Sequence, residues 1–262
     1  MTAFALKILA IVTMTLDHID TVLGQRGLMT LFSLSETVAL HLGDLMTVLG
    51  RLAFPIFAFC IAEGAKKTRS MPKYIGRLAL FAVISEPIYF AVHSRSFGME
   101  ISVADFVEFV LVRQNYSNVL FTLTLGALAL YGYQLLVRKQ IPHPKLWFIP
   151  IGVAAAFAAE YFGCNYGIAG VVLILGLYFA GNNTQRAILI VAWSLYLYII
   201  YQGMGAWNQV WTRPILKFLA ASASAIPICL YNGKQGKKLK WTFYLYYPAH
   251  LLVLLLLRQW LV

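Results

Sequence analysis

The sequence predicts an all-α integral membrane protein, a polytopic bundle of about nine transmembrane helices with its N-terminus in the cytoplasm. Three observations lead to this prediction: an apolar composition, a series of long apolar stretches, and basic residues that cluster between alternate stretches. Hydrophobic residues make up 60% of the 262 residues and charged residues only 12%, whereas a soluble globular chain has about 25% charged residues. The mean hydropathy of +0.73 therefore indicates a chain that lies in a bilayer.

Nine apolar stretches are long enough to cross a hydrocarbon core of about 30 Å. In chain order they cover residues 4–24, 45–64, 74–93, 118–137, 146–162, 165–181, 185–203, 212–230 and 241–259. The two longest connections, 25–44 and 94–117, are expected to be loops. The second contains an apolar segment, Ile101–Val112, which is too short to span and is expected to lie on or dip into the membrane. Because no linker divides the chain, residues 1–262 are predicted to form a single transmembrane domain.

Basic residues indicate the orientation of these helices. Fourteen of the 21 lysines and arginines lie at the amino end or after the second, fourth, sixth and eighth stretches, at positions 7, 66, 67, 69, 73, 77, 138, 139, 145, 186, 234, 237, 238 and 240. Cytoplasmic loops carry such an excess, so the N-terminus is predicted inside and the C-terminus outside. The same rule accounts for the net charge of +11, and nucleic acid is not an expected partner because the cations are scattered over separate loops.

Several polar residues interrupt the apolar stretches. Asp17 and His18 lie near the middle of the first one, where a charged side chain costs at least about 2.5–3.5 kcal/mol and usually marks a functional site. Arg51, Glu86 and His250 occupy similar positions in later stretches. The three cysteines, at positions 60, 164 and 229, have no metal-type spacing, so they are interpreted as packing residues and no metal site is expected.

Lys7 and His18 are eleven residues apart, which corresponds to three helical turns. They are therefore expected on nearly the same helix face, about 16 Å apart along the axis. A ligand with an anionic head and a long arm, such as coenzyme A, would bridge a cation at the cytoplasmic mouth and an imidazole deeper in the membrane. A neutral imidazole can act as a general base. The alternative is that Lys7 is a topology anchor and His18 an interhelical hydrogen-bonding residue.

Five sequence stretches, in order along the chain, carry a resemblance to a known family. They are Leu16-Asp17-His18-Ile19; Gly50-Arg51-Leu52-Ala53-Phe54-Pro55-Ile56-Phe57-Ala58; Asn118-Val119-Leu120-Phe121; Tyr166-Gly167-Ile168-Ala169-Gly170; and Phe243-Tyr244 with Pro248 and His250-Leu251. With this set the chain resembles the TraX family, membrane proteins associated with N-terminal acetylation of conjugative pilin. Through that family it is similar to the transmembrane acyltransferases, which include the acyltransferase-3 proteins and heparan-glucosaminide N-acetyltransferase.

The resemblance implies roles for individual residues. His18 would be the catalytic base, because the superfamily pattern of a basic residue, ten residues and a histidine fits Lys7 and His18. Lys7 would then hold a coenzyme phosphate, although many acyltransferase-3 proteins have arginine at this position and lysine lacks its bidentate fork. Arg51 and Asn118 match family positions and are catalytic candidates that could donate hydrogen bonds to an acyl oxygen, Arg51 also to the coenzyme; both could instead bond between helices.

The remaining intramembrane residues are given structural or cavity-lining roles. Asp17 points about 100° away from the side chain that follows it, so a salt bridge to Arg51 is predicted rather than direct catalysis. Glu86 precedes Pro87, which can break or kink the third helix and leave carbonyls lining a cavity. His250 is expected either to line a cavity or to pack.

The function that these patterns and the resemblance imply is acyl transfer in a membrane of the bacterial inner (cytoplasmic) type. Acetyl-CoA, as co-substrate, would enter from the cytosol, and an amine or hydroxyl acceptor would approach from the bilayer or the outer face. A pilin N-terminus, a glycan and a small metabolite all stay open as acceptors, as do direct transfer and an acetyl-histidine relay. A proton-coupled transporter or flippase is the alternative, because intramembrane Asp, His and Glu also serve as proton relays.

Overall fold

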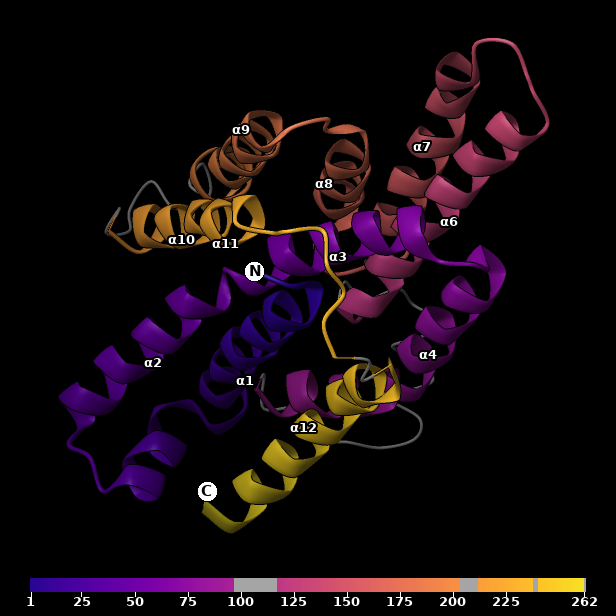
Figure 1. Ribbon diagram of the computed structural model, residues 1–262. Helices are drawn as coiled ribbons and strands as arrows, with labels where there is room; N and C mark the ends of the chain where they lie inside the picture. Colours follow the sequence, from indigo (N-terminus) through magenta and orange to yellow (C-terminus); the bar gives the residue numbers. More distant parts are fainter. Residues whose placement is uncertain (97–116, 203–211, 238–239, 262) are drawn as a thin grey trace. The chain divides into compact units, whose positions relative to one another are not determined.

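A computed structural model describes residues 1–96, 117–202, 212–237 and 240–261, and nearly all of them are helical (Figure 1). No strand occurs in these ranges, which confirms the predicted all-α class. The helices are α1 (Ala3–Phe32), α2 (Glu36–Gly50), α3 (Ala53–Lys67), α4 (Met71–Ser96), α6 (Val119–Arg138), α7 (Pro144–Tyr161), α8 (Gly167–Phe179), α9 (Asn183–Ser194), the π-helix η1 (Leu195–Tyr201), α10 (Thr212–Ala223), α11 (Ala225–Cys229) and α12 (Lys240–Leu261).

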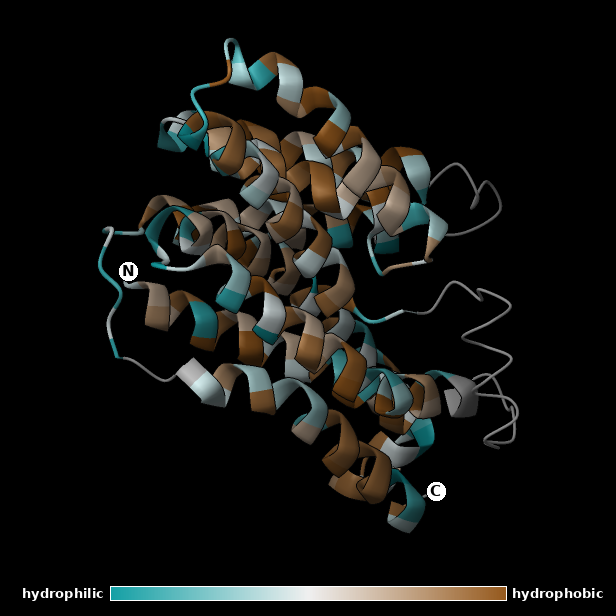
Figure 2. Cartoon of the chain, turned by 90° about the vertical axis from the view of Figure 1, so that its right-hand side faces the viewer, coloured by the Kyte–Doolittle hydropathy of each residue, from teal (hydrophilic) through white to brown (hydrophobic). Residues whose placement is uncertain are grey.

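The helices have the character of membrane-spanning segments. Four helical stretches are long and apolar enough to cross a bilayer, and α8 is a shorter apolar helix; the four stretches are 36–67, 71–93, 119–138 and 183–201. Hydrophobic residues are frequent along the helices, and hydrophilic residues are frequent in the described segments that join them (Figure 2). When α2–α3, α9–η1 and α10–α11 are each counted once, the helical segments among the described residues correspond one to one with the predicted stretches. The chain is an all-α membrane protein.

The expectation of a loop at residues 25–44 is wrong. Gly24 adopts a φ of 63° and kinks α1, which then continues as a helix to Phe32; glycine takes this left-handed conformation without steric cost. Ser33, also left-handed, ends α1, and α2 begins three residues later. Polar residues in α2, such as His41 and Asp44, lower the hydropathy there and hid the helix. The other expected loop segment, Ile101–Val112, lies outside the described residues.

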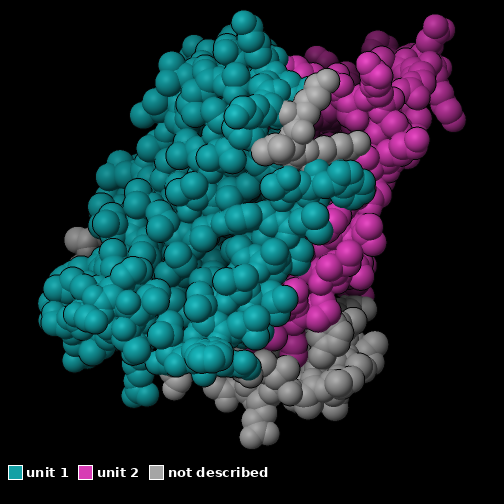
Figure 3. All heavy atoms as spheres, turned by 60° about the horizontal axis from the view of Figure 1, so that its bottom comes forward, with its two compact units in different colours: residues 1–57, 181–262 teal, residues 58–180 magenta. Residues whose placement is uncertain are grey.

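The chain forms two compact units (Figure 3). Unit 1 contains residues 1–57 and 181–262, and unit 2 contains residues 58–180. The predicted single domain over residues 1–262 is not tested by this division and stays a prediction. Unit 1 holds α1, α2, the start of α3, and α9 through α12, whereas unit 2 holds the rest of α3 with α4, α6, α7 and α8.

In unit 1, α12 packs beside α1 and runs in the same direction. Lys7, near the start of α1, lies over the ring of Phe243 near the start of α12. Further along both helices, His18 meets His250. Two parallel helices that both cross a membrane must have an odd number of crossings between them. This parity agrees with the predicted topology, in which the first and last of nine helices run outward.

The other face of α1 packs against α2, which runs antiparallel to it. Gly43 lies against Asp20 and Gly50 against Asp17, so closely that a Cβ atom at either glycine would collide with the aspartate side chain. Small residues at such positions allow helix backbones to approach. The approach brings Arg51, directly after Gly50, within reach of Asp17.

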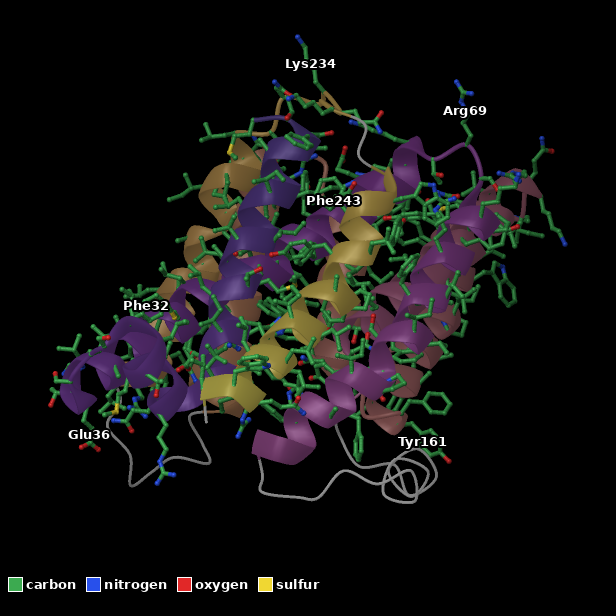
Figure 4. All side chains as sticks on the ribbon, turned by 90° about the horizontal axis from the view of Figure 1, so that it is seen from below. Phe32, Glu36, Arg69, Tyr161, Lys234 and Phe243 are labelled. Carbon is green, nitrogen blue, oxygen red and sulfur yellow. The ribbon has the colours of Figure 1, made fainter. Side chains whose placement is uncertain are left out.

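The orientation of unit 1 can be tested by thiol labelling. Lys234 and Glu36 lie at opposite ends of α1 (Figure 4), and the positive-inside rule places Lys234 in the cytoplasm. In a variant whose three cysteines are replaced by alanine, Glu36→Cys should react with a membrane-impermeant maleimide in intact cells. Lys234→Cys should react only after the cells are opened. The reverse pattern would overturn the orientation and the side from which coenzyme A is expected to enter.

Candidate active site on the first helix

The central feature of the site is a direct hydrogen bond between two imidazoles of unit 1. His18 Nδ1 on α1 and His250 Nε2 on α12 are 2.7 Å apart. On its other side, His250 Nδ1 lies 2.8 Å from the backbone carbonyl oxygen of Tyr246, one turn earlier in α12. His250 is only 7% exposed, whereas His18 is half-buried. The two histidines predicted separately from the sequence therefore form one site.

Aromatic rings surround this pair. The imidazole planes of His18 and His250 are inclined by 21° with centroids 4.9 Å apart, and the ring of Tyr246 stacks on His250 at 5.0 Å. Tyr247 meets His18 edge-on at 6.2 Å. The hydroxyl of Thr15 donates to the carbonyl of Ile11 at 2.8 Å; since it has a single hydrogen, the hydroxyl of Tyr246 must be the donor in their 2.7 Å bond. The bond ties α12 to α1 beside the imidazoles.

Lys7 lies on the same side of α1 as His18. Its Nζ is 5.1 Å from the centroid of the Phe243 ring, and His18 contacts residues further along the same partner helix. The helical rise over eleven residues separates them by about 16 Å. The predicted shared face is therefore confirmed. The cation–π contact holds the ammonium at the start of α12, and a role for Lys7 in phosphate binding stays a prediction.

The adjacent face of α1 carries an ionic network. Asp17 forms a salt bridge with Arg51, as predicted, and both side chains are about one-fifth exposed. Arg51 Nε also donates to the carbonyl of Thr47 at 3.0 Å, and the hydroxyl of Thr47 donates to Asp20 at 2.7 Å. Lys217 on α10 interacts electrostatically with Asp17 and Arg51. Asp17 thus joins helices, and its side chain faces away from the imidazole pair.

Glu86 and Asn118 form a separate polar contact in unit 2. Asn118 caps the N-terminus of α6, where its Oδ1 accepts from the amide of Leu120 at 3.0 Å. Its Nδ2 donates to Glu86 at 2.5 Å and to the carbonyl of Ala82 at 2.8 Å. Asn118 therefore makes the hydrogen bonds between helices that were the alternative to a catalytic role. Its donation to an acyl oxygen stays a prediction. The helix α4 continues through Pro87, so the proline does not end it.

The motif at Tyr166–Gly170 also has a structural explanation in unit 2. Tyr166 and Gly167 both adopt positive φ values, 67° and 41°, at the start of α8. The carboxylate of Glu160 occupies the space where a Cβ atom of residue 167 would lie and accepts from the amide of Ile168 at 3.1 Å. Glycine is therefore needed at position 167 for the turn and for the carboxylate that caps α8.

Cys164, in the short connection between α7 and α8, is an unsuitable nucleophile. Burial raises the pKa of its thiol to about 12. The thiol consequently stays protonated at cellular pH, and the thiolate is the reactive form. This agrees with the prediction of a packing role, since Cys164 belongs to an apolar cluster with Ala156, Ala159 and Val171.

The sequence did not reveal that His250 is the partner of His18. The one sequence feature that pointed toward this pairing is the presence of two intramembrane histidines, each of which needs a hydrogen-bonding partner. A spacing of four residues between Tyr246 and His250 indicates stacking on one helix face. Neither observation identifies the helix that lies opposite, because that depends on the packing of chain segments 232 residues apart.

The Asp17–Arg51 salt bridge can be tested by substitution. Asp17→Asn should destabilise the protein by about 2 kcal/mol because it leaves a largely buried guanidinium without its counter-charge. The measurement is thermal unfolding of purified protein in detergent, with expression level as a second readout. Asp44→Asn is a matched control, since its 3.0 Å pair with Arg213 is exposed and should contribute about 0–1 kcal/mol. Equal effects of the two substitutions would show that the Asp17 pair has no special structural role.

Comparisons with known proteins cover nearly the whole chain. A family model described as "TraX protein" matches residues 3–258. The "Probable fimbrial assembly protein FimC, serogroup H1" of Dichelobacter nodosus is 30% identical over 259 residues, which include 96% of this chain and 93% of that protein. No solved structure matches. His18, Arg51, Asn118 and His250 all lie within the matched range, and the chain belongs to the TraX family.

Proposed function

We propose that this protein is a membrane-embedded acyltransferase that moves an acetyl group from cytosolic acetyl-CoA to an amine or hydroxyl acceptor. The observation that carries the proposal is the arrangement along α1. A basic residue at the helix start and an imidazole about 16 Å further along face the same partner helix. This separation suits a coenzyme that has phosphates at one end and a thioester at the other.

The proposed chemistry needs one base. The acceptor nitrogen or oxygen attacks the thioester carbonyl while His18 takes its proton, and the carbon–sulfur bond then breaks. The proton on His18 passes to the departing coenzyme A thiolate, so the products are acetylated acceptor and free thiol. Either Arg51 or Asn118 is the proposed donor to the developing oxyanion. No covalent enzyme intermediate is required in this scheme.

Family membership and the similar protein narrow the proposed acceptor. The sequence resemblance to the TraX family implies pilin acetylation, and the D. nodosus protein is named for fimbrial assembly. A pilin or fimbrial subunit with a free amino terminus is therefore the acceptor we favour. The proposed location is the bacterial inner membrane, because acetyl-CoA is supplied from the cytosol and the basic loops are predicted on that side.

The role of Lys7 can be tested by ligand-induced stabilisation. Acetyl-CoA at 100 times its Kd should stabilise the wild-type protein by about 2.7 kcal/mol, because it binds only the folded state. Lys7→Ala should weaken acetyl-CoA binding about tenfold or more through loss of a charge-assisted phosphate contact, and Lys7→Arg should keep most of it. Lys234→Ala, which removes a cation from the loop beside the N-terminus, is the control. If acetyl-CoA fails to stabilise the wild type, the transferase proposal gives way to a transporter or flippase.

Substitution of His18 tests the chemical step separately from acetyl-CoA binding. His18→Ala should lower the rate of acetyl transfer by a factor of about 10²–10⁴ while acetyl-CoA still stabilises the protein through its distant phosphates. Transfer is followed with isotope-labelled acetyl-CoA and a synthetic pilin N-terminal peptide. Thr13→Val is the control, because the hydroxyl of Thr13 bonds to the Leu9 and Ala10 carbonyls of its own helix. A wild-type rate in His18→Ala would remove His18 from the mechanism.

A further inference from the structure

We infer that His250 is a positioning residue that fixes the tautomer of His18 and thereby selects Nε2 of His18 as the basic nitrogen. The inference rests on the proposed acyltransferase function and adds a second residue to its machinery. Its physical basis is a chain of two hydrogen bonds, which runs from His18 Nδ1 through His250 to the backbone of α12.

The direction of each hydrogen bond follows from the chemistry of its atoms. A backbone carbonyl oxygen only accepts, so His250 Nδ1 must carry the hydrogen in its 2.8 Å bond to Tyr246. A neutral imidazole has one N–H and one lone pair, which leaves the lone pair of His250 on Nε2. Because that nitrogen accepts, His18 Nδ1 must donate in the 2.7 Å bond between the rings. The lone pair of neutral His18 is therefore on Nε2.

The arrangement resembles a catalytic histidine oriented by a carboxylate, with the difference that the orienting group is uncharged. In unit 1 the carboxylate nearest to His18 in sequence, Asp17, is paired with Arg51 on another face of α1. When His18 Nε2 takes the proton of the acceptor, the Nδ1–H to His250 becomes a bond from a cation and shortens. The positive charge is then shared along the chain toward the carbonyl of Tyr246. His250 accordingly stabilises the charged intermediate state without itself touching the substrate.

Surrounding contacts fix the positions of both rings. His250 is buried between Tyr246 and Tyr247, with ring centroids at 5.0 and 5.6 Å. Tyr246 is held by its hydroxyl bond to Thr15. Fixed rings lower the cost of orienting the base in each catalytic cycle. A histidine that only packed between helices would need neither the hydrogen bond to the Tyr246 carbonyl nor the hydrogen bond to the other imidazole.

Two variants of His250 test the positioning role. In His250→Gln the amide oxygen can still accept from His18 Nδ1, so kcat should stay within about tenfold of the wild type. His250→Leu removes the acceptor, and kcat should fall on the order of 10²-fold with little change in KM for acetyl-CoA. Phe4→Leu removes a ring contact between Phe4 and Phe243, elsewhere between α1 and α12, so it serves as the packing control. Equal loss in all three variants would show a structural role and overturn the inference.

A spectroscopic readout tests the tautomer without depending on activity. Imidazole ¹⁵N shifts of histidine-labelled protein in nanodiscs, at about pH 8 where histidine is neutral, distinguish a protonated Nδ1 from a protonated Nε2. Wild type should show His18 protonated at Nδ1, and His250→Leu should show a mixture or the Nε2–H form. A wild-type His18 protonated at Nε2 would overturn the inference even if acetyl transfer is observed. Absence of transfer with the expected tautomer would instead reject the proposed function.

Discussion

A polar side chain in an apolar helix bundle must find a hydrogen-bond partner, because hydrocarbon offers none. In unit 1 this constraint acts on the single stretch Asp17-His18 and divides α1 into two faces. His18 is satisfied by His250 on α12 and Asp17 by Arg51 beside α2. Since the two side chains point about 100° apart, one helix is bound to two different neighbours at the same depth. The position of the proposed base is a consequence of this double attachment.

The contacts of α1 with α2 and with α12 both depend on how the helix backbones pack. On the α2 side, Gly43 and Gly50 permit the close approach that lets Thr47 and Arg51 reach the aspartates. On the α12 side, the parallel course of two helices from opposite ends of the chain places Phe243 at Lys7 and His250 at His18. A coenzyme bound along this seam would meet a cation first and an imidazole about 16 Å later. Phosphate binding by Lys7 and proton transfer by His18 are thus proposed for one helix face.

The sequence predicts the helical class, the correspondence of apolar stretches with helices, the shared face of Lys7 and His18, and the Asp17–Arg51 pair. These follow from composition, helical periodicity and the cost of an unpaired charge, all of which are local properties. It does not predict that α2 begins at Glu36, because a kink at Gly24 and scattered polar residues hide that helix. It also misses the pairing of His18 with His250, since no periodicity relates two residues so far apart in the chain. Glu86 and Asn118 were recognised as polar residues of interest, yet their mutual contact emerges only from the packing of α4 and α6.

The most direct test of the central claim is the transfer of label from acetyl-CoA across an oriented membrane. Inside-out vesicles, which expose the cytoplasmic face, are loaded with a pilin N-terminal peptide in the lumen and given isotope-labelled acetyl-CoA outside. The account predicts labelled peptide in vesicles that contain the wild-type protein and background label in vesicles that contain His18→Ala. Label that appears equally in both preparations, or in neither, would contradict an acyltransferase that uses His18 as its base.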